Sequence, residues 1–131
     1  MRYSLTSTLL PLLALVAVAR NGGERPRLLD VDRLARAVEQ IESSGKNHPP
    51  YWDVNGMAFG LYGMHLPRWI EIGGTKENWG KASPALQRKL FRSELARRKL
   101  ATILQFSRWH NGSGKGHRDY ARRVSSVYNS K

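Results

Sequence analysis

Residues 31–45 read VDRLARAVEQIESSG, and this stretch decides how the chain folds. Its large apolar residues recur at the spacing of one helix face, at Val31, Leu34, Val38 and Ile41. Asp30 precedes the first turn as a candidate N-cap, and Gly45 follows the last turn as a stop signal. The pattern therefore predicts an amphipathic helix from Val31 to about Ser43.

Glu42 lies inside this apolar stripe, about 40° around the helical wheel from Val38. Burial disfavours the charged form of a carboxyl group, and the negative end of the helix dipole acts in the same direction. We therefore expect the pKa of Glu42 to be raised, as a general acid working near neutral pH requires. The alternative is an ordinary glutamate at the edge of the stripe, with its carboxylate extended into water.

Length and composition limit the classes of protein to consider. A chain of 131 residues suits one domain with a moderate core. The 22 Lys and Arg against 10 Asp and Glu give a formal net charge of +12. This charge favours an anionic partner: nucleic acid, a phospholipid surface or an anionic cell-wall polymer. The absence of cysteine excludes disulfides and thiolate metal sites.

The histidines do not indicate a metal site. They lie at His48, His65, His110 and His117. None of them forms the pair that a helical zinc motif requires. We therefore expect structural or surface histidines, no metal and no organic cofactor.

The N-terminus has the pattern of a targeting segment. Arg2 precedes an uncharged run from Tyr3 to Ala19, and Ala17-Val18-Ala19 fits a small-residue cleavage site. The run is short for a membrane span, and Pro11 interrupts it. The sequence predicts residues 1–19 as a signal peptide, 20–27 as a linker and 28–131 as the folded domain. A retained membrane anchor and a buried helix of the domain are the alternatives; a signal peptide or anchor implies export to the periplasm, cell envelope or cell exterior.

The remaining chain is predicted to be mostly helical. Residues 46–63 resemble a loop with short strands, for example around Met57 to Tyr62, and Pro67 can begin a short helix. Ser83-Pro84 is a strong helix start, and residues 85–109, which contain no Gly or Pro, predict one long helix or two abutting ones. A loop over 111–116 precedes a last helix. The fold class expected is mainly α, with a loop-rich segment, containing a small β element, after the first helix.

Four segments together resemble a known family. They are Ile41-Glu42-Ser43-Ser44-Gly45, Phe59-Gly60-Leu61-Tyr62-Gly63-Met64, Trp109-His110-Asn111-Gly112-Ser113-Gly114 and Tyr120-Ala121-Arg122-Arg123-Val124. Their order and spacing resemble the lysozyme-like lytic transglycosylases, the group of soluble lytic transglycosylases and goose-type lysozymes. The resemblance covers residues 28–128. It departs from the family at Gly63, where a substrate-contacting Gln is common, and at His110, where a Tyr is usual.

The resemblance implies a single lysozyme-like domain that cuts peptidoglycan, with Glu42 as catalytic acid and base. It also implies a set of substrate-binding residues: Ser43, Gly60, Leu61, Tyr62, Met64, His110, Asn111 and Tyr120. For Ser43, Tyr62, Asn111 and Tyr120 the alternative is a structural role in helix, core or turn. Within this family one Glu protonates the glycosidic oxygen between N-acetylmuramic acid and N-acetylglucosamine. It then takes the proton of the muramyl C6 hydroxyl, which closes a 1,6-anhydro ring.

Two further acids lie near this segment. Asp53 is a second candidate carboxylate, which would activate water and make the protein a hydrolysing muramidase. A turn-forming Asp is the alternative. Glu39 lies at the edge of the apolar stripe, and we expect it to be solvated.

A basic stretch of the sequence also bears on function. It contributes Arg88, Lys89, Arg92, Arg97, Arg98 and Lys99 to the predicted long helix. A solvated helix face is the default interpretation. The functional alternative is attraction to an anionic polymer, either the cell wall or, in a different class of protein without catalysis, nucleic acid.

The partners expected are therefore peptidoglycan strands, anionic wall polymers and, through residues 1–19, a membrane. No sequence-specific nucleic acid is expected, since no DNA-binding motif is present. We expect a monomer. A binding-only relative with an impaired cleft is the remaining alternative, and phage lysis, a secretion apparatus and wall turnover would all suit a small wall-opening enzyme.

Overall fold

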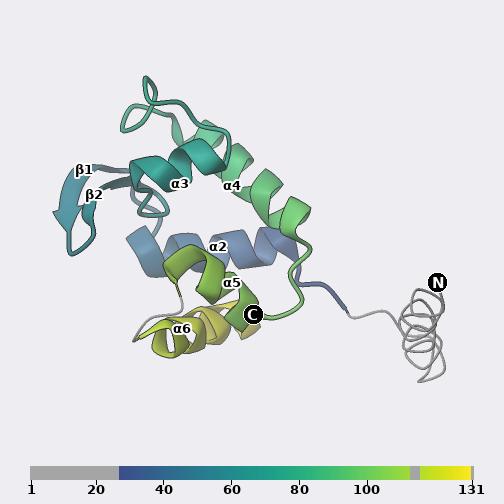
Figure 1. Cartoon of the computed structure of the whole chain (residues 1–131). Coiled ribbons are helices and arrows are strands. Elements are labelled where there is room, and N and C mark those ends of the chain that lie inside the picture. The colour runs from purple at the N-terminus through teal and green to yellow at the C-terminus, as the bar shows by residue number, and fades with distance from the viewer. Residues whose placement is uncertain (1–26, 113–115, 131) are drawn as a thin grey trace, which may run out of the picture.

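The computed structural model describes residues 27–112 and 116–130, so the predicted signal segment (1–19) and all but the last residue of the linker lie outside the described residues. The described elements are α2 (Val31–Ser43), β1 (His48–Asp53), β2 (Gly56–Gly60), α3 (Leu66–Glu71), α4 (Pro84–Arg98), α5 (Ile103–Asn111) and α6 (His117–Asn129). The predicted fold class, mainly α with a small β segment, is confirmed. Figure 1 shows the hairpin and α3 at one end of the helical body. None of the helices in the described ranges has the length and apolar character needed to cross a bilayer.

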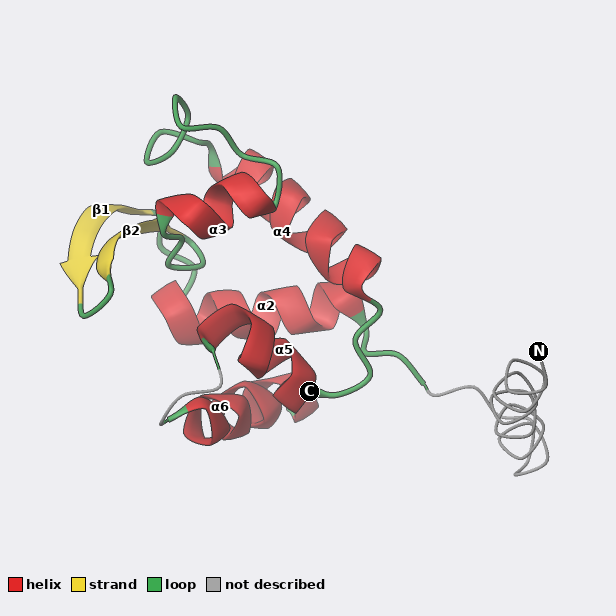
Figure 2. Ribbon diagram, in the orientation of Figure 1, coloured by secondary structure: helices red, strands yellow, loops and turns green. Residues whose placement is uncertain are grey.

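Helix α2 has the bounds that its sequence predicts. The Asp30 carboxylate caps its first turn by accepting a hydrogen bond from the Arg33 backbone N–H (3.0 Å). Its last turn ends at Ser44, which adopts a left-handed conformation with φ 54°. The helix packs against both α4 and α6, and it occupies the middle of the fold in Figure 2. Glu42 is thereby fixed on a central, doubly supported helix.

The two strands form an antiparallel hairpin directly after α2. Tyr51 pairs with Ala58, and Trp52 pairs with Met57. The register shifts between His48 and Tyr51, where two prolines interrupt the strand and supply no backbone N–H donor. The sequence predicts short strands within residues 46–63 and gives Met57 to Tyr62 as an example. The position of the first strand is not specified, because its prolines mask the strand pattern.

The long run after Ser83 forms two helices, one of the two outcomes predicted. Helix α4 stops at Lys99, which has a φ of 50°, and α5 starts after Thr102. Thr102 and Gln105 form a capping box, each side chain bonding the other residue's backbone N–H. The backbone between α4 and α5 is joined to the segment that precedes α2, since Leu29 N–H donates a hydrogen bond to Leu100 O (2.9 Å).

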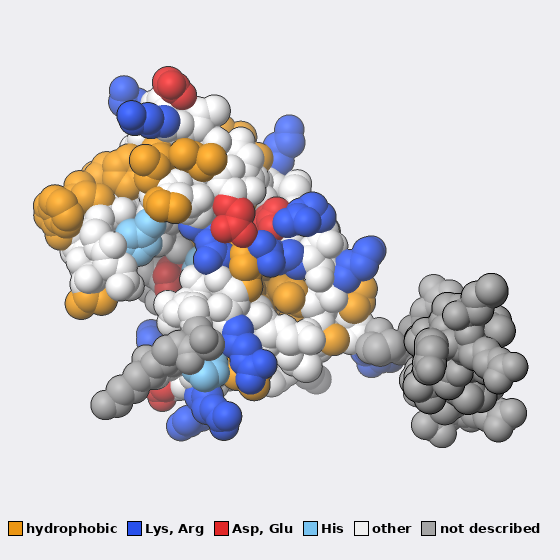
Figure 3. Space-filling model, in the orientation of Figure 1, with side chains coloured by type: hydrophobic (Ala, Val, Ile, Leu, Met, Phe, Trp, Pro, Cys, Tyr) orange, Lys and Arg blue, Asp and Glu red, His pale blue; other side chains and the backbone are white. Residues whose placement is uncertain are grey.

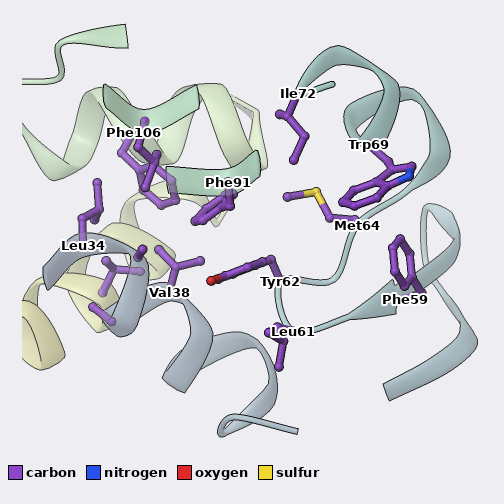
Figure 4. Packing of buried hydrophobic residues seen from close by; sticks show 14 of the residues in the cluster. Leu34, Val38, Phe59, Leu61, Tyr62, Met64, Trp69, Ile72, Phe91 and Phe106 are labelled. Atoms are coloured by element: carbon purple, nitrogen blue, oxygen red, sulfur yellow. The ribbon is translucent and has the colours of Figure 1, made fainter. Parts of the chain in front are cut away.

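The core joins α2, α4, α5 and the segment after β2. Figure 4 shows Tyr62 in the middle of this core, next to Phe91. The two rings stack with centroids 4.1 Å apart. Phe106 of α5 meets Phe91 edge to face, and Leu34 and Val38 of α2 are fully buried in the same cluster. The core therefore fixes the C-terminal half of α2 relative to the segment carrying Gly63.

Candidate active site

A cavity of about 490 Å³ opens where the end of α2, the hairpin, the start of α3 and the end of α5 meet. Its lining is rich in ionisable and hydrogen-bonding side chains. It includes Glu42, Tyr51, Asp53, Asn55, His65, Arg68, Glu71, His110 and Asn111. Glu42 and Tyr51 also line a smaller cavity of about 200 Å³ beside His48. Glu42 thus lines both cavities, and we call the one of about 490 Å³ the main cavity.

Glu42 has the raised pKa that its position in the stripe predicts. Burial is the main cause and raises the pKa from 4.5 to about 7. The charge of Asp53 adds to the rise, whereas Tyr120, Arg123 and His65 oppose it. A carboxyl group with this pKa is present in both protonation states near neutral pH. It can therefore give and take a proton.

Tyr120 of α6 is buried against this carboxyl group. Its hydroxyl interacts with Glu42 strongly enough to lower the pKa of that acid. Among the described residues, however, none lies in hydrogen-bond geometry with this hydroxyl. The hydroxyl is therefore close enough to the carboxyl group to affect its pKa, without forming a well-aligned hydrogen bond to it. It favours the ionised form of Glu42.

Gly63 packs closely against Glu42. A Cβ atom at this position would lie 3.0 Å from Glu42 Oε2 and 3.3 Å from the Tyr51 hydroxyl. Its φ of 62° is also a conformation that L side chains rarely adopt. The segment after β2 therefore brings bare backbone, without a side chain, up to the carboxyl group.

Gln87 of α4 anchors the segment after β2 that carries Gly63. Its side chain is fully buried, and its Oε1 accepts a hydrogen bond from Leu61 N–H (2.8 Å). Its Nε2 donates to Asn47 Oδ1 and to Ala82 O, both at 2.9 Å. The amide fills the space where a side chain of Gly60 would lie. One buried amide thus ties both ends of the hairpin to α4.

Asp53 and His65 form a pair at the mouth of the cavity. His65 Nε2 lies 3.0 Å from Asp53 Oδ1. Partial burial alone would raise the pKa of Asp53, but the hydrogen bonds from His65 and from the Asn55 backbone outweigh it and lower the pKa. Asp53 is therefore an ionised carboxylate and a weak base, in contrast to Glu42.

The opposite wall is built around Trp109. The Arg68 and Arg98 guanidinium groups lie over its ring, 4.3 and 4.1 Å from the centroid. Glu71 accepts hydrogen bonds from the Trp109 indole N–H (3.0 Å) and from Arg98 (2.6 Å). This network fixes the end of α5, and with it the cavity residues His110 and Asn111.

His110 is uncharged in this setting. Burial lowers its pKa to about 3, and the nearby charge of Arg68 contributes. Its ring stacks on Phe106, with centroids 5.2 Å apart. It therefore offers the cavity a neutral hydrogen-bonding edge at any physiological pH.

The structure brings four of the candidate site residues to the main cavity, Glu42, Asp53, His110 and Asn111. It places the others differently. Leu61, Tyr62 and Met64 are buried in the core, and Gly60 lies against Gln87. The Ser43 hydroxyl donates to Glu39 O rather than to Glu42. The sequence-based site did not include four further residues that line the cavity, Tyr51, His65, Arg68 and Glu71. Tyr51 could have been found, because it is two positions from Asp53 and so lies on the same face of a strand.

The prediction that Glu39 is solvated is wrong. Its carboxylate accepts hydrogen bonds from both Arg88 Nε and Arg88 Nη2 (3.0 Å each), and it accepts one from the Tyr62 hydroxyl (3.3 Å). Arg88 lowers the pKa of Glu39. The sequence could not reveal this pairing, because it depends on how α4 crosses α2. Glu39 is therefore held ionised, and Glu42, one turn later, is not.

The basic stretch on α4 is largely neutralised within the molecule. Arg88 pairs with Glu39, Arg92 with Asp32, Arg97 with Glu94, and Arg98 with both Glu94 and Glu71. A guanidinium group that is paired with a carboxylate attracts an external polyanion less strongly. The default interpretation of this stretch, a helix face serving the fold, accounts for these four arginines.

Within residues 27–112 and 116–130, no three His, Asp or Glu side chains lie close enough together to hold a metal ion.

Comparison of the chain with protein-family models, curated proteins and solved structures finds no match. The assignment of function therefore depends on the chemistry of the cavity itself.

Proposed function

We propose that this protein is a peptidoglycan lytic transglycosylase, with Glu42 as its general acid and base. One observation carries the proposal: the Glu42 carboxyl group has a pKa of about 7 and opens onto the main cavity. A group that must both donate and accept a proton works best when its pKa is near the working pH. The resemblance of four sequence segments to that family supports the same chemistry.

The reaction needs only this one residue to move protons. Protonated Glu42 gives its proton to the glycosidic oxygen, and the bond from that oxygen to muramyl C1 breaks. The resulting carboxylate takes the proton of the muramyl C6 hydroxyl, whose oxygen forms a new bond to C1. Glu42 ends protonated, as it began, and no water is consumed. The substrate's own acetamido group can stabilise the positive charge at C1.

The other cavity residues have supporting roles in this proposal. His110 and Asn111 would donate or accept hydrogen bonds with sugar hydroxyl and acetamido groups, because both line the cavity without carrying charge. Tyr120 would stabilise Glu42 while it is ionised between the two steps. The bare backbone at Gly63 would let a sugar ring approach the carboxyl group closely.

A hydrolysing muramidase is the second candidate, and Asp53 is the observation in its favour. Asp53 is ionised and lines the same cavity as Glu42. A carboxylate in that place could activate a water molecule for attack at C1. Its lowered pKa and its bond to His65 make it a poor base, so the single-acid reaction is preferred.

Product masses separate the two candidates. Purified sacculi would be digested with the full chain, with Glu42→Gln and with Asp53→Asn, and soluble products analysed by mass spectrometry. The proposal predicts products lighter than hydrolytic muropeptides by one water, formed by wild type and Asp53→Asn but not by Glu42→Gln. Products with a free reducing end that disappear in Asp53→Asn would establish the hydrolase. A folded wild-type protein that releases nothing would exclude both.

A further inference from the structure

The hairpin carries large apolar side chains that have no place in the core. Trp52 is 78% exposed, and Val54, in the turn of the hairpin, is 98% exposed. Side chains exposed to this extent bury little apolar surface and so add little to folding stability. Hairpin turns normally use Asn, Gly or Asp at such positions. The exposed Trp52 and Val54 therefore indicate a partner outside the folded domain.

These residues continue into an apolar groove. The groove, of about 340 Å³, is lined mainly by Met57, Leu66, Pro67 and Trp79. Trp52 joins it through Met57, its partner in the strand register. We call Trp52, Val54, Met57, Leu66, Pro67 and Trp79 the apolar rim. Figure 3 shows hydrophobic side chains forming a continuous band along this side of the molecule.

Most of the apolar rim faces away from the candidate active site. Tyr51 and Asp53 line the main cavity, so the strand alternation directs Trp52, which lies between them, to the opposite face of the hairpin. The rim and the cavity nevertheless share a border, because the rim residues Val54 and Pro67 also line the cavity. A surface bound by the rim would lie beside the cavity mouth without filling it.

Positive charge lies next to the apolar rim. The loop of residues 72–83 packs on the first strand, since a Cβ at Gly80 would lie 3.1 Å from Pro50 Cγ. This loop presents exposed Lys76 and Lys81, with Glu77 as its acidic residue. The whole chain has a formal net charge of +12. Figure 3 shows Lys or Arg side chains beside the upper end of the apolar band.

We propose that the apolar rim docks on an anionic lipid surface, with Trp52 and Val54 entering its interfacial layer. A projecting turn with an indole and an aliphatic side chain suits the boundary between headgroups and acyl chains. Basic residues beside it suit attraction to anionic headgroups. A protein partner would use the same apolar side chains. The lipid surface is favoured because the apolar residues sit at the tip of a projection and the molecule is strongly cationic. Docking would hold the cavity mouth alongside the bilayer, and it does not depend on what the cavity cleaves.

The test uses the fluorescence of Trp52 and the full chain. The protein is mixed with vesicles of phosphatidylglycerol and phosphatidylcholine whose acyl chains carry bromine, which quenches only indoles that enter the bilayer. Trp69 is fully buried, and Trp79 and Trp109 are half-buried, so Trp52 is the indole best placed to be quenched. The expected result is quenching by anionic vesicles in the wild type. Trp52→Phe should lose most of the quenching while its bound fraction stays within about twofold.

Binding strength gives a second readout. Val54→Ser should weaken vesicle binding roughly tenfold, because one apolar side chain no longer enters the interface. Leu28→Ser is the matched control: Leu28 is 48% exposed and lies beside Leu95 and Leu100, away from the hairpin, so binding should not change. Vesicle-bound wild type without quenching would overturn the proposal, since another part of the chain would then make the contact. Self-association that Val54→Ser abolishes would also overturn it, because the rim would then be an interface between protein copies.

Discussion

The backbone of Gly63 lies against the carboxyl group of Glu42, and no side chain fits between them. A Cβ at Gly63 would come within 3.0 Å of Glu42 Oε2. This proximity depends on Gln87, which anchors the same segment through Leu61 N–H. The acid and the glycine are 21 positions apart in the sequence (63 − 42) and become neighbours only because the hairpin folds back over the end of α2.

Gly63→Ala should impair activity far more than it impairs folding. The added methyl group would press on Glu42 and on the Tyr51 hydroxyl, and we expect at least a tenfold loss of sacculus digestion. The left-handed backbone conformation should cost about 1 kcal/mol of stability. Gly45→Ala is the control, since Gly45 has a similar φ of 79° but its Cβ would meet Glu39 at an ordinary 3.7 Å. Equal activity losses in the two variants would contradict the close approach to Glu42.

Glu42 should make the protein less stable as the pH rises. Its pKa is about 7 in the folded chain and near the ordinary value of 4.5 when unfolded. The folded state therefore holds the proton more tightly, and the stability that this proton contributes is complete below about pH 4.5 and lost as the pH rises through 7. The loss should be roughly 3 kcal/mol, since each pKa unit corresponds to about 1.4 kcal/mol.

Glu42→Gln isolates this contribution. Compared with the wild type, its free energy of unfolding should improve by roughly 3 kcal/mol between pH 4.5 and pH 8, because all other titrations cancel in the difference. Urea unfolding at the two pH values measures it. A difference between the two proteins that stays constant with pH would mean that Glu42 has an ordinary pKa.

Tyr120→Phe should move the alkaline limb of the pH–activity profile to higher pH. The Tyr120 hydroxyl lowers the pKa of Glu42, so its removal should raise that pKa further above 7. The protonated acid would then persist to higher pH. Stability should change by less than about 1 kcal/mol, because the hydroxyl has no well-formed hydrogen bond in the described structure. A limb that stays in place or moves to lower pH would show that this hydroxyl does not act on Glu42.

Gln87→Leu should destabilise the fold although the two side chains have similar volume. The change leaves Leu61 N–H and Ala82 O without their partners inside the core, and we expect a loss of about 2–4 kcal/mol. Gln40→Leu, at an exposed position of α2, is the control and should stay within about 0.5 kcal/mol. Thermal unfolding of both variants measures the difference, and similar losses would contradict the anchoring role of Gln87.

Local sequence patterns predicted those parts of the fold that local interactions determine. The spacing of apolar residues and the Asp30 cap defined α2 to its last residue, since both signals lie within the helix or next to it. The break at Lys99 has no Gly or Pro to mark it. It follows from the capping box at Thr102 and Gln105, a signal that was present in the sequence but hidden within a continuous apolar pattern.

The candidate site was predictable only in part, for a similar reason. The raised pKa of Glu42 followed from its place in the apolar stripe of one helix. Arg68 and His65 reach the cavity through the packing of α3 against the hairpin, which no local pattern encodes. Tyr62 looked like a cleft residue from its motif, but tertiary packing places its ring on Phe91 and its hydroxyl on Glu39.

The central claim is that Glu42 is the acid that breaks the glycan strand, and the most direct test is release of soluble fragments from purified sacculi. Wild type is compared with Glu42→Gln and with Glu77→Gln, which removes the same charge from an exposed loop position. Circular dichroism confirms that all three proteins are folded. The account predicts equal release by wild type and Glu77→Gln, and a loss of at least a hundredfold in Glu42→Gln. Release by Glu42→Gln at the wild-type rate would contradict it.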